Sequence, residues 1–584
     1  MSADKTMGNI TKRTKRFNGR NVALLVIAAI IICALGVWGT VLAYHRAGSQ
    51  GTILDAIYSS MQFFKLGSRL EAGPKPWQAE LARFLAPLFT LAALLEVIAA
   101  LLGRGLRLRF LRGHTIVCGL GRKGVFIAHE LLRRGEQVVV IEQTADHSAL
   151  AGCRRLGALI IEGFEQDPSV LKMARVDTAA RLICVCGADA DNLACARAAE
   201  RLLSHTKTKK GPLQCIVHAA SIGWAACASQ VNLLPLWTGR IETVLFNFYE
   251  QVARRTLSHA PLDRIQITPE DKRRVHLVVI GFGQMGEALT LQAAHIAHLA
   301  NCAKPAVTII DPAVHNLRNA FLARRPAAGD AVDLDFIECI AQDPVARQRL
   351  VQLAGDGQQL LTVAVCVDRP QEAIEIALSL PAALSDTGIP VLVRLTEDSG
   401  IASVFSATQT SALTPFCAVA DGCGMDFIGS DNLDEIPRAI HLAYLAHETK
   451  KNKRLGSEPS LLPWEQLNED LRDSCRRQAD HTAVKLRAVG CKIVKPAADK
   501  TAAEFNFTAE ELEMLARMEH QRWCAERYLK GWRLEEKKDV QRRLSPWLVP
   551  WERLPEDMRE YDRVFVRAIP GLLLSTGLGV ERGV

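Results

Sequence analysis

Two glycine-rich motifs of the same spacing are the strongest chemical signals in this sequence. They are Gly119-Leu-Gly-Arg-Lys-Gly124 and Gly281-Phe-Gly-Gln-Met-Gly286. Each follows an apolar run typical of a buried strand and precedes an amphipathic helix, and the next apolar run ends at an acid, Glu142 or Asp311. In this order the glycines let the backbone approach a pyrophosphate, the helix N-terminus stabilises its charge, and the acid can bind ribose hydroxyls. The sequence therefore predicts two nucleotide sites.

The two copies stay alike beyond the motif. Glu162-Gly-Phe-Glu-Gln-Asp-Pro168 matches Glu338-Cys-Ile-Ala-Gln-Asp-Pro344. We therefore expect two doubly wound, Rossmann-like α/β domains, at residues 113–262 and 273–446. The candidate ligand-binding residues are Gly119, Gly121, Arg122, Gly124, Glu142 and Asp167 in the first domain and Gly281, Gly283, Gly286 and Asp311 in the second.

The first copy resembles the regulator-of-potassium-conductance family (RCK, or Trk-type NAD-binding domains). The resemblance rests on the glycine motif, the acid after the second strand, Gly163, Asp167 and the loop Gly187-Ala-Asp-Ala-Asp-Asn192, and it extends more loosely over residues 113–440. It implies paired domains in a cytosolic ring beneath a tetrameric pore, with NAD or another adenine nucleotide as ligand. For either copy the alternative is a degenerate fold kept as a scaffold, and the second copy has a longer insert before Asp311.

Two long apolar runs precede the first glycine motif. The run at about residues 21–45 is long enough, at 1.5 Å per residue, to cross a hydrocarbon core of about 30 Å. A second run at 81–102 is followed at once by several arginines. Because basic residues stand before the first run and after the second, both termini are expected in the cytoplasm of a multi-pass protein of the cell inner (plasma) membrane. The alternative for the first run is a signal peptide.

A short amphipathic segment, residues 52–68, lies between these runs. It is too brief to span a bilayer, and Thr52 is a candidate N-cap, so we expect a re-entrant helix. The order of span, short helix and span resembles two-span pore-loop channels, although Phe63-Phe-Lys-Leu-Gly-Ser68 stands where potassium channels carry their filter sequence. The residues expected on the apolar face of this helix are Ile53, Ile57, Met61 and Phe64.

The candidate pore residues are Lys65, Leu66, Gly67, Ser68 and Glu96. Glu96 lies inside the second apolar run, and a carboxylate at membrane depth usually faces a protein interior or a water path. The alternative is a carboxylate near the inner membrane interface. Residues 1–112 are therefore predicted to form a transmembrane pore unit that contacts the lipid bilayer.

The C-terminal part carries a second internal repeat. Pro463-Trp-Glu-Gln-Leu-Asn-Glu-Asp-Leu-Arg472 matches Pro550-Trp-Glu-Arg-Leu-Pro-Glu-Asp-Met-Arg559. The polar stretch 447–460 before the first copy is typical of a linker. We therefore place a separate domain at residues 460–584.

Three segments within that domain resemble the RyR repeat domain of ryanodine receptors and bacterial proteins. They are Glu519-His-Gln-Arg-Trp523, Gly531-Trp532 and Leu548-Val-Pro-Trp551. The resemblance implies a mainly helical, non-catalytic module. Aromatic rings beside charged groups suit a nucleobase and a phosphate, and the alternative is that the tryptophans are core residues. The ligand candidates are Glu519, Arg522, Trp523 and Trp532.

Composition narrows the function. The net charge of +8 is mild and the basic residues gather near the apolar runs, so we expect no nucleic-acid partner. The 16 cysteines include no CxxC pair, no metal site is expected, and no nucleophile–base arrangement indicates an enzyme. The combined prediction is a homotetrameric, nucleotide-gated cation channel with an RyR sensor, in stress or antiphage signalling. The alternatives are a membrane-anchored regulatory subunit of a separate transporter and an NAD-dependent oxidoreductase.

Overall fold

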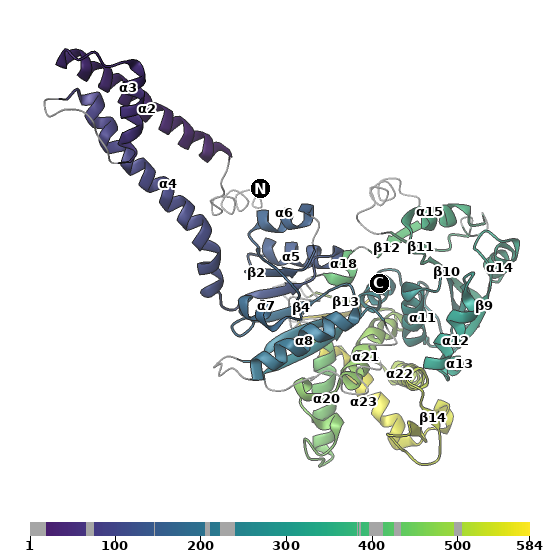
Figure 1. Ribbon diagram of the computed structural model, residues 1–584. Helices are drawn as coiled ribbons and strands as arrows, with labels where there is room; N and C mark the ends of the chain where they lie inside the picture. The colour runs from purple at the N-terminus through teal and green to yellow at the C-terminus, as the bar shows by residue number, and fades with distance from the viewer. Residues whose placement is uncertain are drawn as a thin grey trace. The chain divides into compact units, whose positions relative to one another are not determined.

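The computed structural model divides the chain into two compact units, Met1–Leu111 and Arg112–Val584 (Figure 1). The structure describes residues 19–65, 75–144, 147–204, 211–221, 240–381, 384, 387–395, 413–417, 419–424, 434–495 and 505–583. Within the helices, the side chains of residues 19–25, 95–107 and 147 are outside that description.

The N-terminal unit consists of three helices, α2 (Gly19–Ala47), α3 (Ile53–Phe63) and α4 (Trp77–Arg109). Small residues let α2 approach the other two closely. A Cβ atom on Gly39 would lie 2.2 Å from the backbone nitrogen of Ala79, so only glycine fits there. Nearby, Ser60 of α3 donates to the carbonyl of Cys33 at 3.0 Å.

Helix α3 begins as predicted but turns a different face inward. Thr52 is its N-cap and forms a reciprocal capping box with Asp55. The predicted apolar face is not the buried one, because Ile53, Ile57 and Met61 are 69, 40 and 59% exposed. The residues buried against the other helices are Ala56, Ser59, Ser60 and Phe63. Helices in lipid pack through small residues and leave apolar side chains outside, which is the pattern here.

The membrane predictions are tested only in part. By length and composition, the segment Val26–Ala47 of α2 can cross a membrane, and it is the single such helix among the residues searched. Lys65 follows α3 and is exposed. Leu66, Gly67 and Ser68 lie outside the described residues, as does the side chain of Glu96 within α4. The second span and the pore therefore stay predictions.

The second unit contains two six-stranded parallel sheets with the same strand order, which confirms the predicted duplication. The orders are β3-β2-β1-β4-β5-β6 and β12-β11-β10-β7-β8-β9 (Figure 1). Strands β1 and β8 are buried along their whole length, and β4, β7 and β10 are buried at every residue but the first, as expected for parallel strands covered by helices on both faces. The register aligns Cys118 of β1 with Ile141 of β2 and Cys184 of β4, so the carboxyl ends of these strands meet at one edge.

The elements of the first sheet domain are β1 (Thr115–Cys118), α5 (Arg122–Arg133), β2 (Val138–Glu142), α6 (His147–Leu156), β3 (Leu159–Glu162), α7 (Pro168–Met173), β4 (Arg181–Cys184), α8 (Asp189–Ser204), β5 (Leu213–His218), β6 (Ile241–Phe246) and α10 (Phe248–His259). Those of the second are β7 (Arg274–Ile280), α11 (Gln284–Ile296), β8 (Ala306–Ile310), α12 (Val314–Arg324), α13 (Ala328–Ala331), β9 (Asp333–Ile337), α14 (Pro344–Gly355), β10 (Gln359–Val365), α15 (Pro370–Ser379), β11 (Val391–Arg394), β12 (Leu413–Phe416) and α18 (Val419–Cys423).

The C-terminal module is mainly helical, as predicted. Its long helices are α20 (Glu435–Lys450), α21 (Glu469–Ala488), α22 (Ala509–Leu529) and α23 (Glu556–Ser575). The short strands β13 (Cys491–Val494) and β16 (Gly579–Arg582) pair in antiparallel fashion, and β14 (Arg533–Leu534) pairs with β15 (Leu544–Ser545). Single 3-10 turns lie at η2 (Pro459–Leu461), η3 (Trp464–Gln466) and η4 (Trp551–Arg553).

The predicted linker is part of this folded module. Helix α20 continues to Lys450 and packs against α21 and α23. The Glu448 side chain is buried and forms an ion pair of 2.7 Å with Lys453, and Tyr444 lies 3.2 Å from Ser460 through their hydroxyls. The polar composition of residues 447–460 therefore reflects paired charges, and the module begins at α20 and not at residue 460.

The module is built from two repeats related by matching contacts. The first runs from α20 to β13 and the second from α22 to β16. His441 and His520 each have Nε2 2.8 Å from a carbonyl oxygen, that of Leu462 and that of Val549 respectively. Buried Arg472 donates to the Trp464 and Glu465 carbonyls at 3.1 and 2.8 Å, and Arg559 donates to those of Trp551 and Glu552 at 3.0 and 2.9 Å.

Candidate functional site

The glycine motifs form two nearly identical backbone cradles. Gly119 and Gly281 have φ of +92° and +90°, a region that favours glycine. A Cβ on Gly124 would lie 1.9 Å from the oxygen of Gly119, and one on Gly286 would lie 2.2 Å from that of Gly281. These glycines are therefore needed for the strand-to-helix turn itself.

The middle glycines serve a different purpose. A Cβ on Gly121 or Gly283 would have no atom of another part of the chain within 4 Å. Packing therefore does not require glycine at these positions, and both face open space at the N-terminus of the following helix. That is where the backbone of a dinucleotide-binding fold approaches a pyrophosphate, so both cradles fit the predicted ligand class.

The predicted acids lie beside the cradles in both domains. The Glu142 carboxylate accepts the backbone N–H of Leu120, inside the glycine motif, and Asp311 accepts that of Phe282 at 2.8 Å. Each carboxylate also accepts a backbone N–H just beyond its own strand, at 2.8 Å from Gln143 in the first domain. The acids are thus placed at the loop where ribose hydroxyls would bind, and those hydroxyls would compete with the backbone donors.

Asp167 has a local role in the structure. Its carboxylate accepts the N–H of Ser169 at 2.8 Å and caps α7, and Asp343 caps α14 in the same way through Val345. Helix capping accounts for the aspartate in both copies. A contact between Asp167 and a ligand stays a prediction.

The two cradles differ in charge. Arg122 is exposed at the first turn of α5, whereas Gln284 stands at the same place in α11. Lys123 follows, with its Nζ 2.9 Å from His218 Nε2 and 5.0 Å from the ring centre of Phe248. Positive charge at a helix N-terminus favours phosphate, so the first cradle is the better anion site.

Burial and charge fix the protonation of the Lys123–His218 pair. Burial lowers the pKa of Lys123, and burial together with the neighbouring ammonium lowers the pKa of His218 to about 3. His218 is therefore neutral near pH 7 and accepts the lysine hydrogen bond. The sequence gives no sign of this pair, because the two residues come from distant segments, β5 and the glycine motif.

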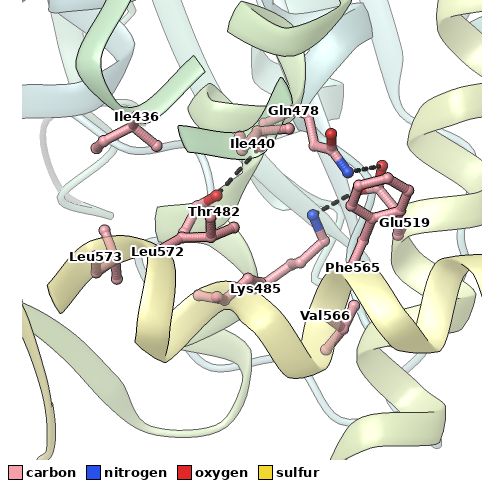
Figure 2. A pocket seen from close by; sticks show the side chains of 11 residues that line it. Ile436, Ile440, Gln478, Thr482, Lys485, Glu519, Phe565, Val566, Leu572 and Leu573 are labelled. Carbon is pink, nitrogen blue, oxygen red and sulfur yellow. Dashed lines mark hydrogen bonds and ion pairs between the residues drawn. The ribbon is translucent and has the colours of Figure 1, made fainter. Parts of the chain in front are cut away.

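Two of the predicted ligand residues of the C-terminal module are interior. Arg522 pairs with Glu519 at 2.8 Å and with Glu526 at 2.7 Å, and all three side chains are at most 3% exposed. Lys485 adds a bond of 2.5 Å to Glu519. Figure 2 shows Lys485 and Glu519 at a cavity between the helices, but its volume of about 10 Å³ has room for about one water. Glu519 and Arg522 are therefore internal charge partners and not ligand contacts, which corrects the prediction.

The tryptophans divide into core and half-buried residues. Trp464 and Trp551 are 6 and 5% exposed, which fits the alternative that they are core. Trp523 and Trp532 are half-buried, and the guanidinium carbon of Arg527 lies 5.4 and 5.1 Å from their ring centres. Arg527 was not predicted, although its place four residues after Trp523 puts both on one helix face.

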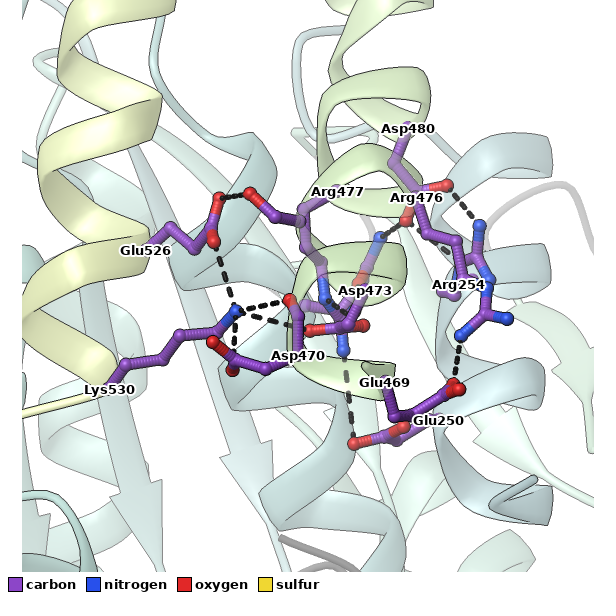
Figure 3. Close-up of polar contacts among 12 residues, drawn as sticks. Glu250, Arg254, Glu469, Asp470, Asp473, Arg476, Arg477, Asp480, Glu526 and Lys530 are labelled. Atoms are coloured by element: carbon purple, nitrogen blue, oxygen red, sulfur yellow. Dashed lines mark hydrogen bonds and ion pairs between the residues drawn. The ribbon is translucent and has the colours of Figure 1, made fainter. Parts of the chain in front are cut away.

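Helix α21 links the module to both nucleotide folds. Arg254 of α10 binds Asp480 through two hydrogen bonds of 2.7 and 2.8 Å (Figure 3). Arg477 donates to Gln292 of α11 at 2.8 Å and pairs with Asp473 at 3.3 Å. Burial opposes the charge on Asp473, but Arg477 and Lys530 outweigh it and lower its pKa to about 2.

The insert of the second nucleotide fold also contacts the module. The carbonyl of His298 accepts a hydrogen bond of 2.9 Å from His481, and that of Cys302 accepts one of 3.0 Å from Gln521. The extra residues before β8 therefore hold the C-terminal module.

The connection that precedes β7 adds a further contact, because Arg487 of α21 binds Asp263 with two bonds of 2.7 Å.

Comparison with known proteins identifies two domains of the chain. Residues 115–219 match the TrkA-N domain and residues 503–582 match the RyR domain. The first match covers strands β1 to β5 of the first nucleotide fold, and the second covers the second helical repeat. The chain thus contains a segment that matches the TrkA-N domain, a second nucleotide fold of the same strand order, and a helical module whose second repeat matches the RyR domain.

Individual relatives are distant. An uncharacterized protein of Methanothermus fervidus is 28% identical over 188 residues, which is 29% of this chain and 28% of that protein. Among solved structures, GsuK bound to ADP covers 69% of this chain and 95% of that chain at 16% identity and a TM-score of 0.36. The GsuK channel bound to NAD covers 73% and 84% at 14% identity and a TM-score of 0.35. Both scores are low, so the fold assignment rests on the strand order.

Proposed function

We propose that this chain is a nucleotide-gated cation channel, assembled as a homotetramer, in which the two nucleotide folds and the RyR-type module regulate ion passage. The observation that carries the proposal is the matched pair of cradles. In each, the outer glycines are needed for the turn while the middle glycine, Gly121 or Gly283, faces open space. The match of residues 115–219 to the TrkA-N domain and the apolar helix α2 support the proposal.

The residues of the first cradle have separable roles in this proposal. The backbone at Gly121 allows close approach of a pyrophosphate, and the α5 N-terminus with Arg122 stabilises its charge. Glu142 binds ribose hydroxyls, as its position beside the Leu120 N–H allows. NAD and ADP are ligands of the GsuK structures, and they are our candidate ligands here.

Helix α21 gives the ligand a mechanical route. It is bonded to α10 of the first fold and α11 of the second, so a change in the angle between the folds must move it. A ligand shifts this equilibrium only if it binds one arrangement more tightly than the other. The C-terminal module then acts as a second input, and a role in stress or antiphage signalling would follow from the ligand it binds.

The proposal is tested by cation flux from liposomes that contain only this protein. We expect NAD or ADP to change the flux of the wild type, and the Gly121→Ala, Gly283→Ala double variant to have lost that response. We expect Glu96→Ala to change the ion selectivity or conductance. Nucleotide binding without any flux would contradict the channel and favour the alternative, a regulatory subunit of a separate transporter.

A further inference from the structure

At one pair of equivalent positions the two helical repeats carry opposite charges, and within the described residues the cation of this pair has no ion-pair partner. Asn452 and Gly531 mark the equivalence, since both have positive φ, 62° and 78°, after the first helix of their repeat. The backbone N–H of the next residue bonds to the carbonyl of Glu448 in the first repeat and of Arg527 in the second. Glu448 and Arg527 therefore occupy the same place.

The charge of the first repeat is satisfied internally. Glu448 is 1% exposed and binds Lys453 at 2.7 Å and the Tyr561 hydroxyl at 3.0 Å. Lys453 is the residue that corresponds to Trp532. A buried carboxylate with two such partners is satisfied without a ligand.

The charge at the equivalent position of the second repeat, on Arg527, has no such internal ion pair among the described residues. Arg527 lies between the rings of Trp523 and Trp532 at 5.4 and 5.1 Å, which holds its plane by cation–π contact. Its Nε is buried and has no hydrogen-bond partner, and the structure shows no ion pair for its guanidinium within the described part of the chain. The adjacent carboxylate of Glu526 is already bound by Arg522 and Lys530, at 2.7 and 3.0 Å.

The chain around Arg527 adds positive charge. The loop after Trp532 is longer than its counterpart in the first repeat, and β14 and β15 order it. Arg543 in this loop donates to the carbonyl of Lys530 at 2.6 Å, beside the Gly531 turn. The loop contains five basic residues, Arg533, Lys537, Lys538, Arg542 and Arg543, against three acidic ones, Glu535, Glu536 and Asp539.

We propose that Arg527, held between Trp523 and Trp532, binds a phosphate group of an anionic small molecule, at one site per chain and in the second repeat only. The planar fork of a guanidinium matches a phosphate or carboxylate, and an excess of positive charge favours the more highly charged phosphate. The site deepens the proposed function by placing the second ligand input, and its gating role rests on that proposal. The binding itself does not.

The test is calorimetric titration of the full chain with inorganic pyrophosphate and with ADP. It is done in the Gly121→Ala, Gly283→Ala background, so that the nucleotide folds do not contribute. We expect Arg527→Met to weaken the binding about 10- to 100-fold, the loss for a charge-assisted hydrogen-bonded contact. Arg454→Met is the control. Arg454 is the first-repeat counterpart of Arg533, so this variant removes an arginine from the repeat that has no proposed site, and it should change the affinity by less than about twofold.

Two further measurements keep the outcome clear. Arg527→Lys keeps the charge but loses the planar fork, so it should bind the anion with intermediate affinity. It replaces Arg527→Met in the test if that variant does not fold. Binding should also change the tryptophan fluorescence of the background protein, since two rings flank the site. The proposal is overturned if neither anion binds the background protein. It is also overturned if the Arg527→Met variant binds the anions as tightly as the background protein does. Binding at Arg527 without ion flux would support this site and contradict only the proposed function.

Discussion

Arg254 of α10 and Asp480 of α21 form a two-bond ion pair, at 2.7 and 2.8 Å, that joins the first nucleotide fold to the C-terminal module. The same carboxylate accepts a hydrogen bond of 3.1 Å from Gln292 of the second fold. One side chain thus connects three parts of the chain. Any change in the relation between the two folds must strain or break one of these bonds.

The Arg254→Ala variant tests how strongly the parts are coupled. Both side chains of the pair are at least four-fifths buried, at 17 and 15% exposure, so the loss of Arg254 leaves a carboxylate with one partner. We expect a loss of about 2–3 kcal/mol in the free energy of unfolding. Arg567→Ala is the control, since Arg567 is 54% exposed, and it should cost less than about 1 kcal/mol. Equal effects in urea denaturation would show that the pair does not couple the domains.

The glycine motif should separate stability from binding. Gly124→Ala places a Cβ 1.9 Å from a backbone oxygen, so we expect a loss of about 2 kcal/mol or more in the free energy of unfolding. Gly121→Ala meets no atom and should unfold like the wild type, but its methyl group would occupy the space needed by a pyrophosphate. Thermal unfolding and nucleotide titration check the two effects. Unchanged nucleotide affinity in a folded Gly121→Ala protein would show that the cradle is only a scaffold.

Two equivalent histidines have opposite pKa shifts. Burial lowers the pKa of His441. Burial acts on His520 in the same direction, but Asp562 and Cys524 outweigh it and raise the pKa of His520 to about 10. The difference follows from two substitutions between the repeats, because Cys475 and Leu445 stand where the second repeat has Asp562 and Cys524.

The two shifts predict opposite pH dependences of stability. His520 stabilises the fold fully below its unfolded pKa of 6.5, and this contribution is lost as the pH rises toward 10. His441 acts in reverse, since the unfolded chain takes up its proton first as the pH falls below 6.5. In urea denaturation across this range, His520→Gln should flatten the alkaline loss and His441→Gln the acid loss. A parallel displacement of the whole curve in both variants would contradict these assignments.

The N-terminal unit should depend on one close helix contact. Gly39→Leu would force α2 away from the backbone of Ala79, so we expect loss of the compact unit and a lower unfolding temperature. Ala34→Leu adds the same side chain at an exposed position of α2 and should change little. Thermal unfolding in detergent compares the two. Equal stability of both variants would show that α2 and α4 do not pack through Gly39.

The features predicted correctly are those with a local signal. The apolar strand, the three glycines and the acid at Glu142 follow one another within about thirty residues, so the first nucleotide fold and its copy could be predicted from the order alone. The repeated Pro463 and Pro550 segments likewise indicated two related structures. The local sequence of each motif determines its local structure, without a contribution from residues distant in the chain.

The features that were missed depend on distant partners. Helix α20 has Tyr444 and Glu448 where α22 has Trp523 and Arg527, so the two helices do not look alike in sequence. The charges at the end of α20 resemble those of a linker, because the pairing of Glu448 with Lys453 and Tyr561 is visible only in the structure. Charged residues on a helix also give no sign of burial. Glu519 and Arg522 were therefore predicted at a ligand site, although Lys485 and Glu526 complete their pairing inside the module.

The most direct test of the account is electrical recording from the purified protein in a planar bilayer, before and after nucleotide is added to the cytosolic side. We predict that NAD or ADP changes the open probability of the wild type. The Gly121→Ala, Gly283→Ala variant should form the same channel without that response. Currents that are identical in both proteins, with and without nucleotide, would contradict the claim that the nucleotide folds control ion passage.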